Sequence, residues 1–370
     1  MSEQIDSYTG YYKSFTDKYS QLIDTFISDF YKEKIEYAES DYMKDMYGII
    51  LEYCLRDGKR IRPVLMLNSY LGYRKGFKKI KEIIKFGAAV ELMHSFLLIQ
   101  DDIIDKSLTR RGGGAMHILL QEKYSHITGI SSIGSDLAIV LADVVFVNAI
   151  EIINRADARA GDKSRFLDIF SKTYEKTAWG QILDSLSSKP KDADINSDTP
   201  LRISLMKTAF YTVAYPIIMG YVLAGEKKKS EMMSIEEFSL PLGIAFQIRD
   251  DVLGVFGVEM ETGKSVDSDI EEGKFTLLVQ STLQRLPVPE QEEFLKILLS
   301  EKKSGKQVSF IRNSILHSGA ADDTLARHLE LIAEAEAKLE KLRLNESAKN
   351  VLRGVVDVIS HIPADISSFR

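Results

Sequence analysis

Three aspartates lie together at the end of an apolar stretch of the chain. Asp101, Asp102 and Asp105 directly follow the segment Leu97–Gln100. Asp101 and Asp105 are four residues apart, so on a helix they share one face and repel each other. A hard cation such as Mg²⁺, which takes oxygen ligands from carboxylates and phosphates, would remove this repulsion. Taken alone, the motif fits a metal site and a solvated helix end equally well.

Two arginines follow this acidic motif at once. Arg110 and Arg111 precede a run of three glycines, residues 112–114. A guanidinium is planar and forms paired hydrogen bonds with phosphate. Carboxylates that hold a metal beside arginines that hold phosphate are the pattern expected of a metal–diphosphate site. The combination favours such a site over a solvated charge patch.

A second pair of aspartates ends another apolar stretch, later in the chain. Asp250 and Asp251 follow the segment 246–249, and Lys264 and Lys274 come after them. Two acidic helices that face each other can bracket several Mg²⁺ ions and stabilise a pyrophosphate leaving group. One aspartate pair is weak evidence, but two pairs that are each followed by basic residues predict a metal-dependent diphosphate site.

Basic residues also cluster well before the first aspartates. Lys59 and Arg62 belong to the sequence GKRIRP, residues 58–63, at an expected helix start. The cluster fits either a solvated turn or a second diphosphate site that needs no metal.

Polar residues also interrupt other apolar segments. Lys207 and Thr208 lie in an expected helix over residues 203–218, where a buried amine needs a partner that a diphosphate could supply. Asp184 fits an ordinary polar helix position, and His94 fits either a satisfied core histidine or a binding residue.

Apolar spacing predicts that helices position these side chains. Leu22, Phe26 and Phe30 recur every four residues, and similar series cover residues 83–97 and 240–255. Strict alternation is rare, so few strands are expected. The tail over residues 322–359 predicts an amphipathic helical hairpin. Residues 133–153 carry two aspartates, so we expect a buried core helix there and no transmembrane segment.

Composition limits the class of protein. The chain has 370 residues, of which 45% are hydrophobic and 28% charged, and its net charge is −6. This composition is typical of a globular protein and disfavours nucleic-acid binding. Cys54 is the single cysteine, so a reducing compartment, the cytoplasm, is expected. We predict one all-α domain over residues 1–370, a large helical bundle around a deep central apolar cavity.

The motifs together resemble the trans-isoprenyl diphosphate synthases of the polyprenyl synthetase family. The resemblance runs from about Gly58 to Leu278 and keeps the family's motif order: GKRIRP, ELMHSFLLIQDDIID with RRG, GQILD, KT, FQIRDDVLG, GK and DIEEGK. It implies an all-α isoprenoid synthase fold, a homodimer and three Mg²⁺ ions. The implied activity condenses isopentenyl diphosphate with an allylic diphosphate.

The resemblance also implies a role for each matching residue. Asp101 and Asp105 would bind Mg²⁺ with support from Asp102. Asp250 would bind a further ion with Asp251 beside it, and Asp184 would be an auxiliary contact near the metals. The remaining roles concern the substrates. Arg110, Lys207 and Lys264 would hold the allylic diphosphate; Lys59, Arg62, His94 and Arg111 would hold isopentenyl diphosphate; Lys274 would contact diphosphate; and Thr208 and Gln247 would face the allylic cation. Lys207, Thr208, Gln247 and Arg110 form the expected catalytic set.

Two positions depart from the family pattern. The second acidic motif ends in Gly254, where many members have a third aspartate, which puts a metal contact there in doubt. Gly114 stands where the family often has proline, which predicts a looser loop before His117.

Product length is expected to depend on the helix that carries Asp101. Phe96 precedes Asp101 by five residues and would lie about 7 Å deeper along that helix. Leu97 is one residue nearer and points elsewhere. In the family, a single aromatic at the position of Phe96 accompanies short products, and many farnesyl-forming members have a second aromatic at the position of Leu97. This pattern favours geranylgeranyl diphosphate as the product, with farnesyl diphosphate as the alternative.

Two other functions fit parts of the pattern. A class I terpene cyclase also uses an acidic helix, but it needs no second diphosphate site such as GKRIRP. A non-catalytic subunit of a synthase could lose its acids, whereas both aspartate pairs are present here. A short-chain prenyltransferase explains all the motifs together.

Overall fold

The chain is almost entirely helical. The computed structural model describes residues 7–74, 79–187, 198–257 and 267–362. Within these ranges the strands are β1 (Thr109–Arg110) and β2 (Gly113–Gly114), which pair antiparallel as one short hairpin. The predicted all-α class and the scarcity of strands are confirmed.

The fold divides into two compact units. Unit 1 comprises residues 1–12, 171–215 and 228–370, and unit 2 comprises residues 13–170 and 216–227. The first acidic motif and GKRIRP lie in unit 2, and the second acidic motif lies in unit 1. The single domain and its central cavity stay predictions.

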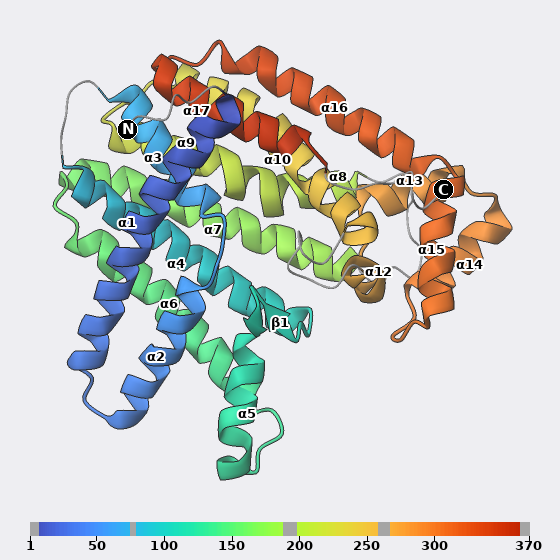
Figure 1. Ribbon diagram of the computed structural model, residues 1–370, viewed down its shortest axis with the longest axis horizontal. Helices are drawn as coiled ribbons and strands as arrows, with labels where there is room; N and C mark the ends of the chain where they lie inside the picture. The colour runs from blue at the N-terminus through green and yellow to red at the C-terminus, as the bar shows by residue number, and fades with distance from the viewer. Residues whose placement is uncertain (1–6, 75–78, 188–197, 258–266, 363–370) are drawn as a thin grey trace. The chain divides into compact units, whose positions relative to one another are not determined.

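Unit 2 is built around a long helix that carries the first acidic motif. Helix α4 (Ile80–Ile104) packs against α3 (Ile61–Tyr73) and α6 (Ile133–Arg155), and α5 (Met116–Thr128) packs on α6 (Figure 1). The unit also holds most of α1 (Tyr8–Glu36), α2 (Asp41–Leu55), the first part of α7 (Ala160–Ser187) and most of α9 (Tyr215–Leu223). Phe86 of α4 meets Phe166 of α7 edge to face, with ring centroids 4.8 Å apart.

The predicted N-terminal helix is confirmed, but its buried face differs from the one expected. Ile23, Ile27 and Phe30 are buried, whereas Leu22 is 42% exposed. The four-residue spacing from Leu22 therefore identified the helix correctly and placed its apolar stripe one residue too early.

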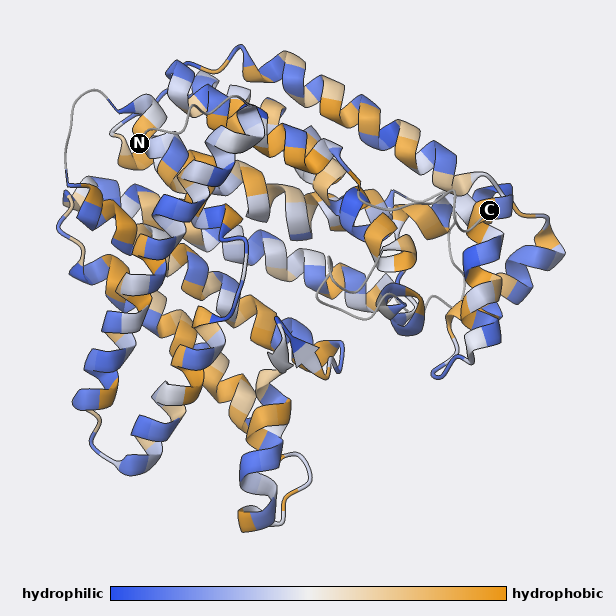
Figure 2. Ribbon diagram, viewed as in Figure 1, coloured by the Kyte–Doolittle hydropathy of each residue, from blue (hydrophilic) through white to orange (hydrophobic). Residues whose placement is uncertain are grey.

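Helix α6 is a core helix on one side only. Ala138, Leu141 and Val145 are buried, whereas Val140 and Val147 are 59% and 62% exposed. The helix is mainly hydrophobic (Figure 2). The expected buried core helix is confirmed for its inner face, whereas its outer face is exposed. No helix among the described residues is long and apolar enough to cross a membrane, as predicted.

Unit 1 is organised around α10 (Lys229–Phe256), which carries the second acidic motif. It packs against a π-helix, η1 (Ser204–Ala214), and against α16 (Ala320–Leu339). Helices α16 and α17 (Glu346–Ser360) pack together and alternate blue and orange residues (Figure 2), which confirms the amphipathic hairpin predicted for the tail. The other elements are α8 (Thr199–Ile203), α12 (Ser268–Glu272), α13 (Leu277–Arg285), α14 (Val288–Leu298) and α15 (Gly305–His317).

Candidate active site

The first acidic motif lies at the carboxyl end of α4. Asp105 caps this helix, and its backbone N–H donates to the carbonyl of Asp101 at 2.8 Å. Asp101 and Asp105 are half-buried, and the Asp101 side chain is 21% exposed. The two carboxylates expected to bind metal therefore stand one turn apart at the surface of unit 2.

Asp102 has different surroundings from its neighbours. Its side chain is fully buried, and Arg110 Nε donates to Oδ1 at 2.8 Å while the Tyr53 hydroxyl donates to Oδ2 at 3.0 Å. Arg110 Nη2 also lies 3.7 Å from Asp101 Oδ2. Asp102 thus anchors Arg110 beside Asp101, and its role in supporting a metal site stays a prediction.

A tight hairpin returns Arg110 to the end of α4. Arg111 and Gly112 form its turn with φ values of 50° and 74°, as a two-residue hairpin turn with matching twist requires. Arg56 Nη1 donates to the carbonyls of Arg110 and Gly114 at 3.0 and 2.8 Å. The looser loop expected from Gly114 is therefore wrong, because Arg56 holds both strands.

The basic cluster GKRIRP turns its side chains in two directions. Arg60 caps α3 with a left-handed φ of 45° and is buried, while Lys59 is exposed and Arg62 is half-buried. Arg62 Nη1 lies 3.3 Å from His94 Nε2 on α4. The structure thus brings together two of the residues assigned to isopentenyl diphosphate, and Arg111 lies against Gly58 of the same cluster.

The buried, positively charged surroundings of His94 keep its imidazole neutral. Burial lowers the pKa of the His94 imidazole well below its usual range, and positive charge lowers it further. The charges come from Arg62, Arg111, Arg110 and Arg60. A neutral imidazole can accept a hydrogen bond from Arg62, which helps to orient that guanidinium.

In unit 1, a π-helix carries the two polar residues expected in an apolar helix. Lys207 and Thr208 lie in η1, which neighbouring helices approach closely. A Cβ at Gly180 would lie 2.8 Å from Lys207 N, and one at Gly243 would lie 2.4 Å from Ala209 Cα. Both glycines let backbones meet where a side chain would separate them. π-helical turns are often found at functional sites.

Two side chains of η1 connect to aspartates of unit 1, one directly and one through a glutamine. Lys207 is half-buried, not buried as expected, and its Nζ lies 2.8 Å from Asp184 Oδ2, so the amine has a partner within the protein. Thr208 hydrogen-bonds to Gln247, whose Nε2 donates to Asp251 Oδ1 at 2.7 Å. Thr208, Gln247 and Asp251 therefore form one continuous hydrogen-bonded chain.

The two aspartates of the second motif differ in exposure. The Asp250 side chain is 45% exposed, whereas Asp251 is buried. The pKa of the Asp251 carboxyl lies well above its usual range, because burial and then the nearby Asp269 disfavour its charge. Asp250 is thus the residue of this pair that is accessible to a metal ion.

Asp269 occupies the space left by the unusual Gly254. A Cβ on Gly254 would lie 2.2 Å from Asp269 Oδ2, so any other residue there would displace this carboxylate. The other oxygen of Asp269 lies 3.3 Å from Lys274 Nζ. No role was predicted for Asp269, although it belongs to the motif DIEEGK. Lys264 lies outside the described residues.

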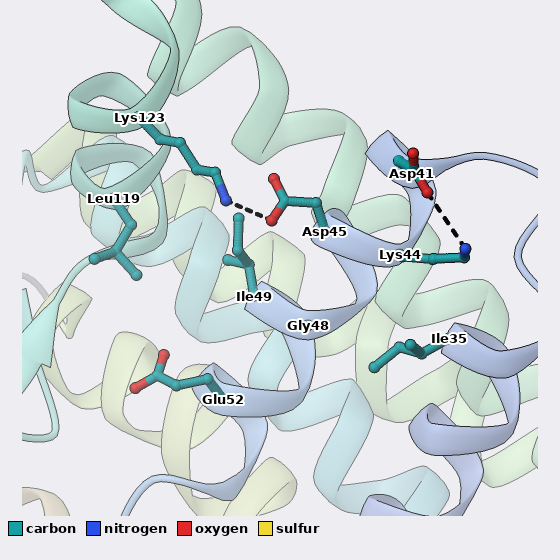
Figure 3. A pocket seen from close by; sticks show the side chains of 9 residues that line it. All are labelled: Ile35, Asp41, Lys44, Asp45, Gly48, Ile49, Glu52, Leu119 and Lys123. Carbon is teal, nitrogen blue, oxygen red and sulfur yellow. Dashed lines mark hydrogen bonds and ion pairs between the residues drawn. The ribbon is translucent and has the colours of Figure 1, made fainter.

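A surface groove of unit 2 lies apart from these residues. It has a volume of about 720 Å³ and is lined by residues of α1, α2 and α5 (Figure 3). Lys123 pairs with Asp45 at 2.5 Å and Lys44 with Asp41 at 3.3 Å. The two lysines are thus paired with carboxylates of α2, and we do not place a diphosphate here.

Most of the chain matches one known protein family. The polyprenyl synthetase family model matches residues 44–315, which include both acidic motifs and GKRIRP. The chain belongs to the polyprenyl synthetase family. The synthetase is a short-chain trans-prenyltransferase, in agreement with the prediction from its motifs.

Archaeal enzymes are among the similar sequences. The polyprenyl synthetase is 29% identical over 350 residues to a short chain isoprenyl diphosphate synthase of Methanothermobacter thermautotrophicus, covering 92% of this chain and 96% of the relative. It is 31% identical over 300 residues to a geranylgeranyl diphosphate synthase of Sulfolobus acidocaldarius. This match covers 80% of this chain and 83% of the relative.

Solved structures show the same fold. A geranylgeranyl pyrophosphate synthase of Corynebacterium glutamicum, complexed with isoprenyl diphosphate and magnesium, has 25% identity and a TM-score of 0.87, covering 94% of this chain and 99% of that one. A geranylgeranyl pyrophosphate synthetase of Pyrococcus horikoshii has 26% identity and a TM-score of 0.77. The match covers 95% of this chain and 98% of that one.

The residues of the synthetase fit a divalent metal of the Mg²⁺ type. Within the described ranges, no group of three or more histidines, cysteines, aspartates and glutamates could hold a metal ion by itself. Mg²⁺ is usually bound by one or two carboxylates together with substrate phosphates and water. Asp101 with Asp105 on α4, and Asp250 on α10, supply hard oxygen donors of this kind.

Proposed function

We propose that this synthetase condenses isopentenyl diphosphate with an allylic diphosphate in a Mg²⁺-dependent reaction, and that geranylgeranyl diphosphate is its main product. The observation that carries the proposal is the contact of Arg62 with His94, with Arg111 lying against the same GKRIRP cluster. This cationic corner stands beside the first acidic motif and supplies a second diphosphate site, which a terpene cyclase does not need.

In the proposed reaction, the allylic diphosphate loses pyrophosphate. Arg110 and Lys207 neutralise the departing oxygens, since fixed cations stabilise charge that develops in the transition state. Bound at Asp101, Asp105 and Asp250, Mg²⁺ would supply Lewis-acid stabilisation of the leaving group. We propose that three Mg²⁺ ions bind in each active site.

Condensation and proton loss complete the cycle. Arg62, Lys59, Arg111 and His94 hold isopentenyl diphosphate, whose double bond attacks C1 of the allylic cation. The carbon–oxygen bond breaks when pyrophosphate leaves, and the carbon–carbon bond then forms at C1 of the cation. Thr208 and Gln247 present their oxygens toward that cation. One proton then leaves the adjacent carbon for the released pyrophosphate. The products are a longer allylic diphosphate and pyrophosphate.

The exposed face of α6 supports a homodimer. Ile139, Val140, Val147 and Ile150 are 49%, 59%, 62% and 36% exposed and follow one side of the helix. This side is apolar except for the exposed Asp143, and an exposed apolar surface of this kind marks an interaction site. We propose that a second copy of the chain covers it. Val147→Glu should convert a dimer to a monomer in light scattering coupled to gel filtration; a monomeric wild type would refute the dimer.

The proposed reaction is tested by product chromatography. Labelled isopentenyl diphosphate is supplied with dimethylallyl, geranyl or farnesyl diphosphate, with Mg²⁺ or with a chelator. We expect geranylgeranyl diphosphate as the main product, and only with Mg²⁺. Product formed from the allylic diphosphate alone would indicate a cyclase. Turnover that appears only after a partner protein is added would indicate a non-catalytic subunit.

A further inference from the structure

Glu91 is a buried acid that none of the roles assigned above uses. It lies on α4, one turn before His94, and is 1% exposed. Its Oε1 atom lies 3.0 Å from Arg60 Nη1 and 3.5 Å from Arg111 Nη2. One carboxylate oxygen thus connects the basic cluster GKRIRP to the turn of the hairpin.

Arg60 is the fixed member of this group. Its Nε donates to Asp24 Oδ1 at 2.9 Å, and its Nη2 donates to the carbonyls of Cys54 and Arg56, both at 3.0 Å. With Nη1 on Glu91, four of its five N–H groups are used inside the protein. Arg60 therefore has little capacity left for a substrate, and its role is to hold the start of α3.

Arg111 is the adjustable member. Its side chain is 16% exposed, and its contact with Glu91 is longer than that of Arg60. The two guanidiniums lie close together, since a Cβ at Gly58 would be 2.7 Å from Arg111 Cζ and 2.9 Å from Arg60 Nη1. Like charges at such separations repel each other, and a carboxylate that contacts both offsets that repulsion. Glu91 is the acid that both of them contact.

We propose that Glu91 is a positioning residue that keeps Arg111 aimed at isopentenyl diphosphate, an inference that rests on the second diphosphate site proposed above. Glu91 forms a stable ion pair with Arg60 and orients the guanidinium of Arg111. Arg111 then forms the hydrogen bond to the substrate diphosphate. Both arginines adopt left-handed backbones, with φ of 45° for Arg60 and 50° for Arg111. Surrounding contacts must maintain such conformations in residues other than glycine.

The direct test shortens this side chain and keeps its charge. Glu91→Asp leaves the electrostatic attraction for an anion unchanged but withdraws the carboxylate from Arg111. We expect the KM for isopentenyl diphosphate to rise about tenfold, the effect of one lost charge-assisted hydrogen bond. The KM for the allylic primer should stay within about twofold, because Arg110 and Lys207 are untouched.

The matched control is the other carboxylate that binds Arg60. Asp24→Asn weakens the ion pair that Asp24 forms with Arg60. In the described structure, no ion pair or hydrogen bond joins Asp24 to Arg111. Its KM for isopentenyl diphosphate should therefore change by less than about twofold. If Asp24→Asn matches Glu91→Asp, or if Glu91→Asp raises both KM values equally, Glu91 is only structural and the inference is overturned.

A second variant displaces the Arg111 side chain without changing Glu91. Gly58→Ala places a Cβ where the Arg111 guanidinium lies and should also raise the KM for isopentenyl diphosphate. Calorimetric titration with isopentenyl diphosphate in a chelating buffer gives the affinity without turnover. A wild type that does not bind this substrate refutes the proposed function. A wild type that binds, with Glu91→Asp and Gly58→Ala binding equally well, refutes only the role of Glu91.

Discussion

Arg110 donates from Nε to the buried Oδ1 atom of Asp102 over 2.8 Å, and this ion pair fastens the hairpin β1–β2 to the end of α4. The Arg110 side chain is 10% exposed, so removing its partner leaves a poorly solvated charge. Asp102→Asn should lower the free energy of unfolding by about 3 kcal/mol. It should also lower turnover, because Arg110 would no longer be held beside the diphosphate.

The control for this prediction is Tyr53→Phe. The Tyr53 hydroxyl donates to the other oxygen of Asp102 at 3.0 Å and has no contact with a substrate in the proposed site. Its loss should cost about 1 kcal/mol in urea unfolding and leave turnover nearly unchanged. An Asp102→Asn enzyme with wild-type stability and turnover would show that Arg110 is held by other contacts.

The two diphosphate sites should respond separately to substitution. Arg62 lies 3.3 Å from His94 in unit 2, whereas Lys207 is bound to Asp184 at 2.8 Å in unit 1. Arg62→Ala should raise the KM for isopentenyl diphosphate more than that for the primer, because it removes a bidentate phosphate donor. Lys207→Ala should do the reverse or lower kcat. Equal effects of each variant on both substrates in steady-state kinetics would contradict the assignment.

The sequence predicted the helices and the grouping of these residues better than it predicted their individual contacts. Apolar spacing identified α4 and α10, because each presents a long buried face. It could not reveal that Asp102 turns inward while Asp101 stays accessible, since that depends on where Arg110 returns after the hairpin. The hairpin itself depends on left-handed backbone at Arg111, a residue type that does not signal such a turn.

Two further features depended on contacts between distant residues. The π-helix η1 is closely approached at Gly180 and Gly243, and no local pattern encodes these approaches. The absence of a third aspartate at Gly254 put a metal contact there in doubt, which stays a prediction. It could not show that the carboxylate of Asp269, fifteen residues later, occupies that space.

Product length should depend on a pair of aromatic rings. Phe96 is 2% exposed, and its ring centroid lies 5.0 Å from that of Phe146 on α6; Leu97 is half-buried. Phe96→Ala should shift the products toward longer chains, because it removes one ring from the proposed pocket floor. Phe146 remains in that variant and can fill part of the space, so Phe96→Ala/Phe146→Ala should lengthen the products further.

Chromatography of the products measures this shift. Leu97→Ala is the comparison at the adjacent position, and it should alter the product distribution less than Phe96→Ala does. An unchanged distribution from fully active Phe96→Ala and double-variant enzymes would place the floor elsewhere.

His94 should make the folded state less stable in acid. Because burial lowers the pKa of His94 in the folded protein, only the unfolded chain takes up its proton near pH 6.5. The free energy of unfolding should therefore fall as the pH drops below 6.5, by up to about 1.4 kcal/mol per pH unit from this residue. Urea unfolding of wild type and His94→Gln between pH 7.5 and 5 measures the difference. Identical pH dependence in both proteins would show that the pKa of His94 is the same in the folded and unfolded states and would contradict the prediction.

We propose that the acidic motifs of α4 and α10 both serve the Mg²⁺-dependent condensation. Turnover of purified Asp101→Ala and Asp250→Ala with isopentenyl diphosphate, primer and Mg²⁺ tests it most directly, with circular dichroism to verify that the helices are intact. Each variant should lose turnover by orders of magnitude, because the leaving group loses a metal ligand. Near-normal turnover in either folded variant would contradict the claim.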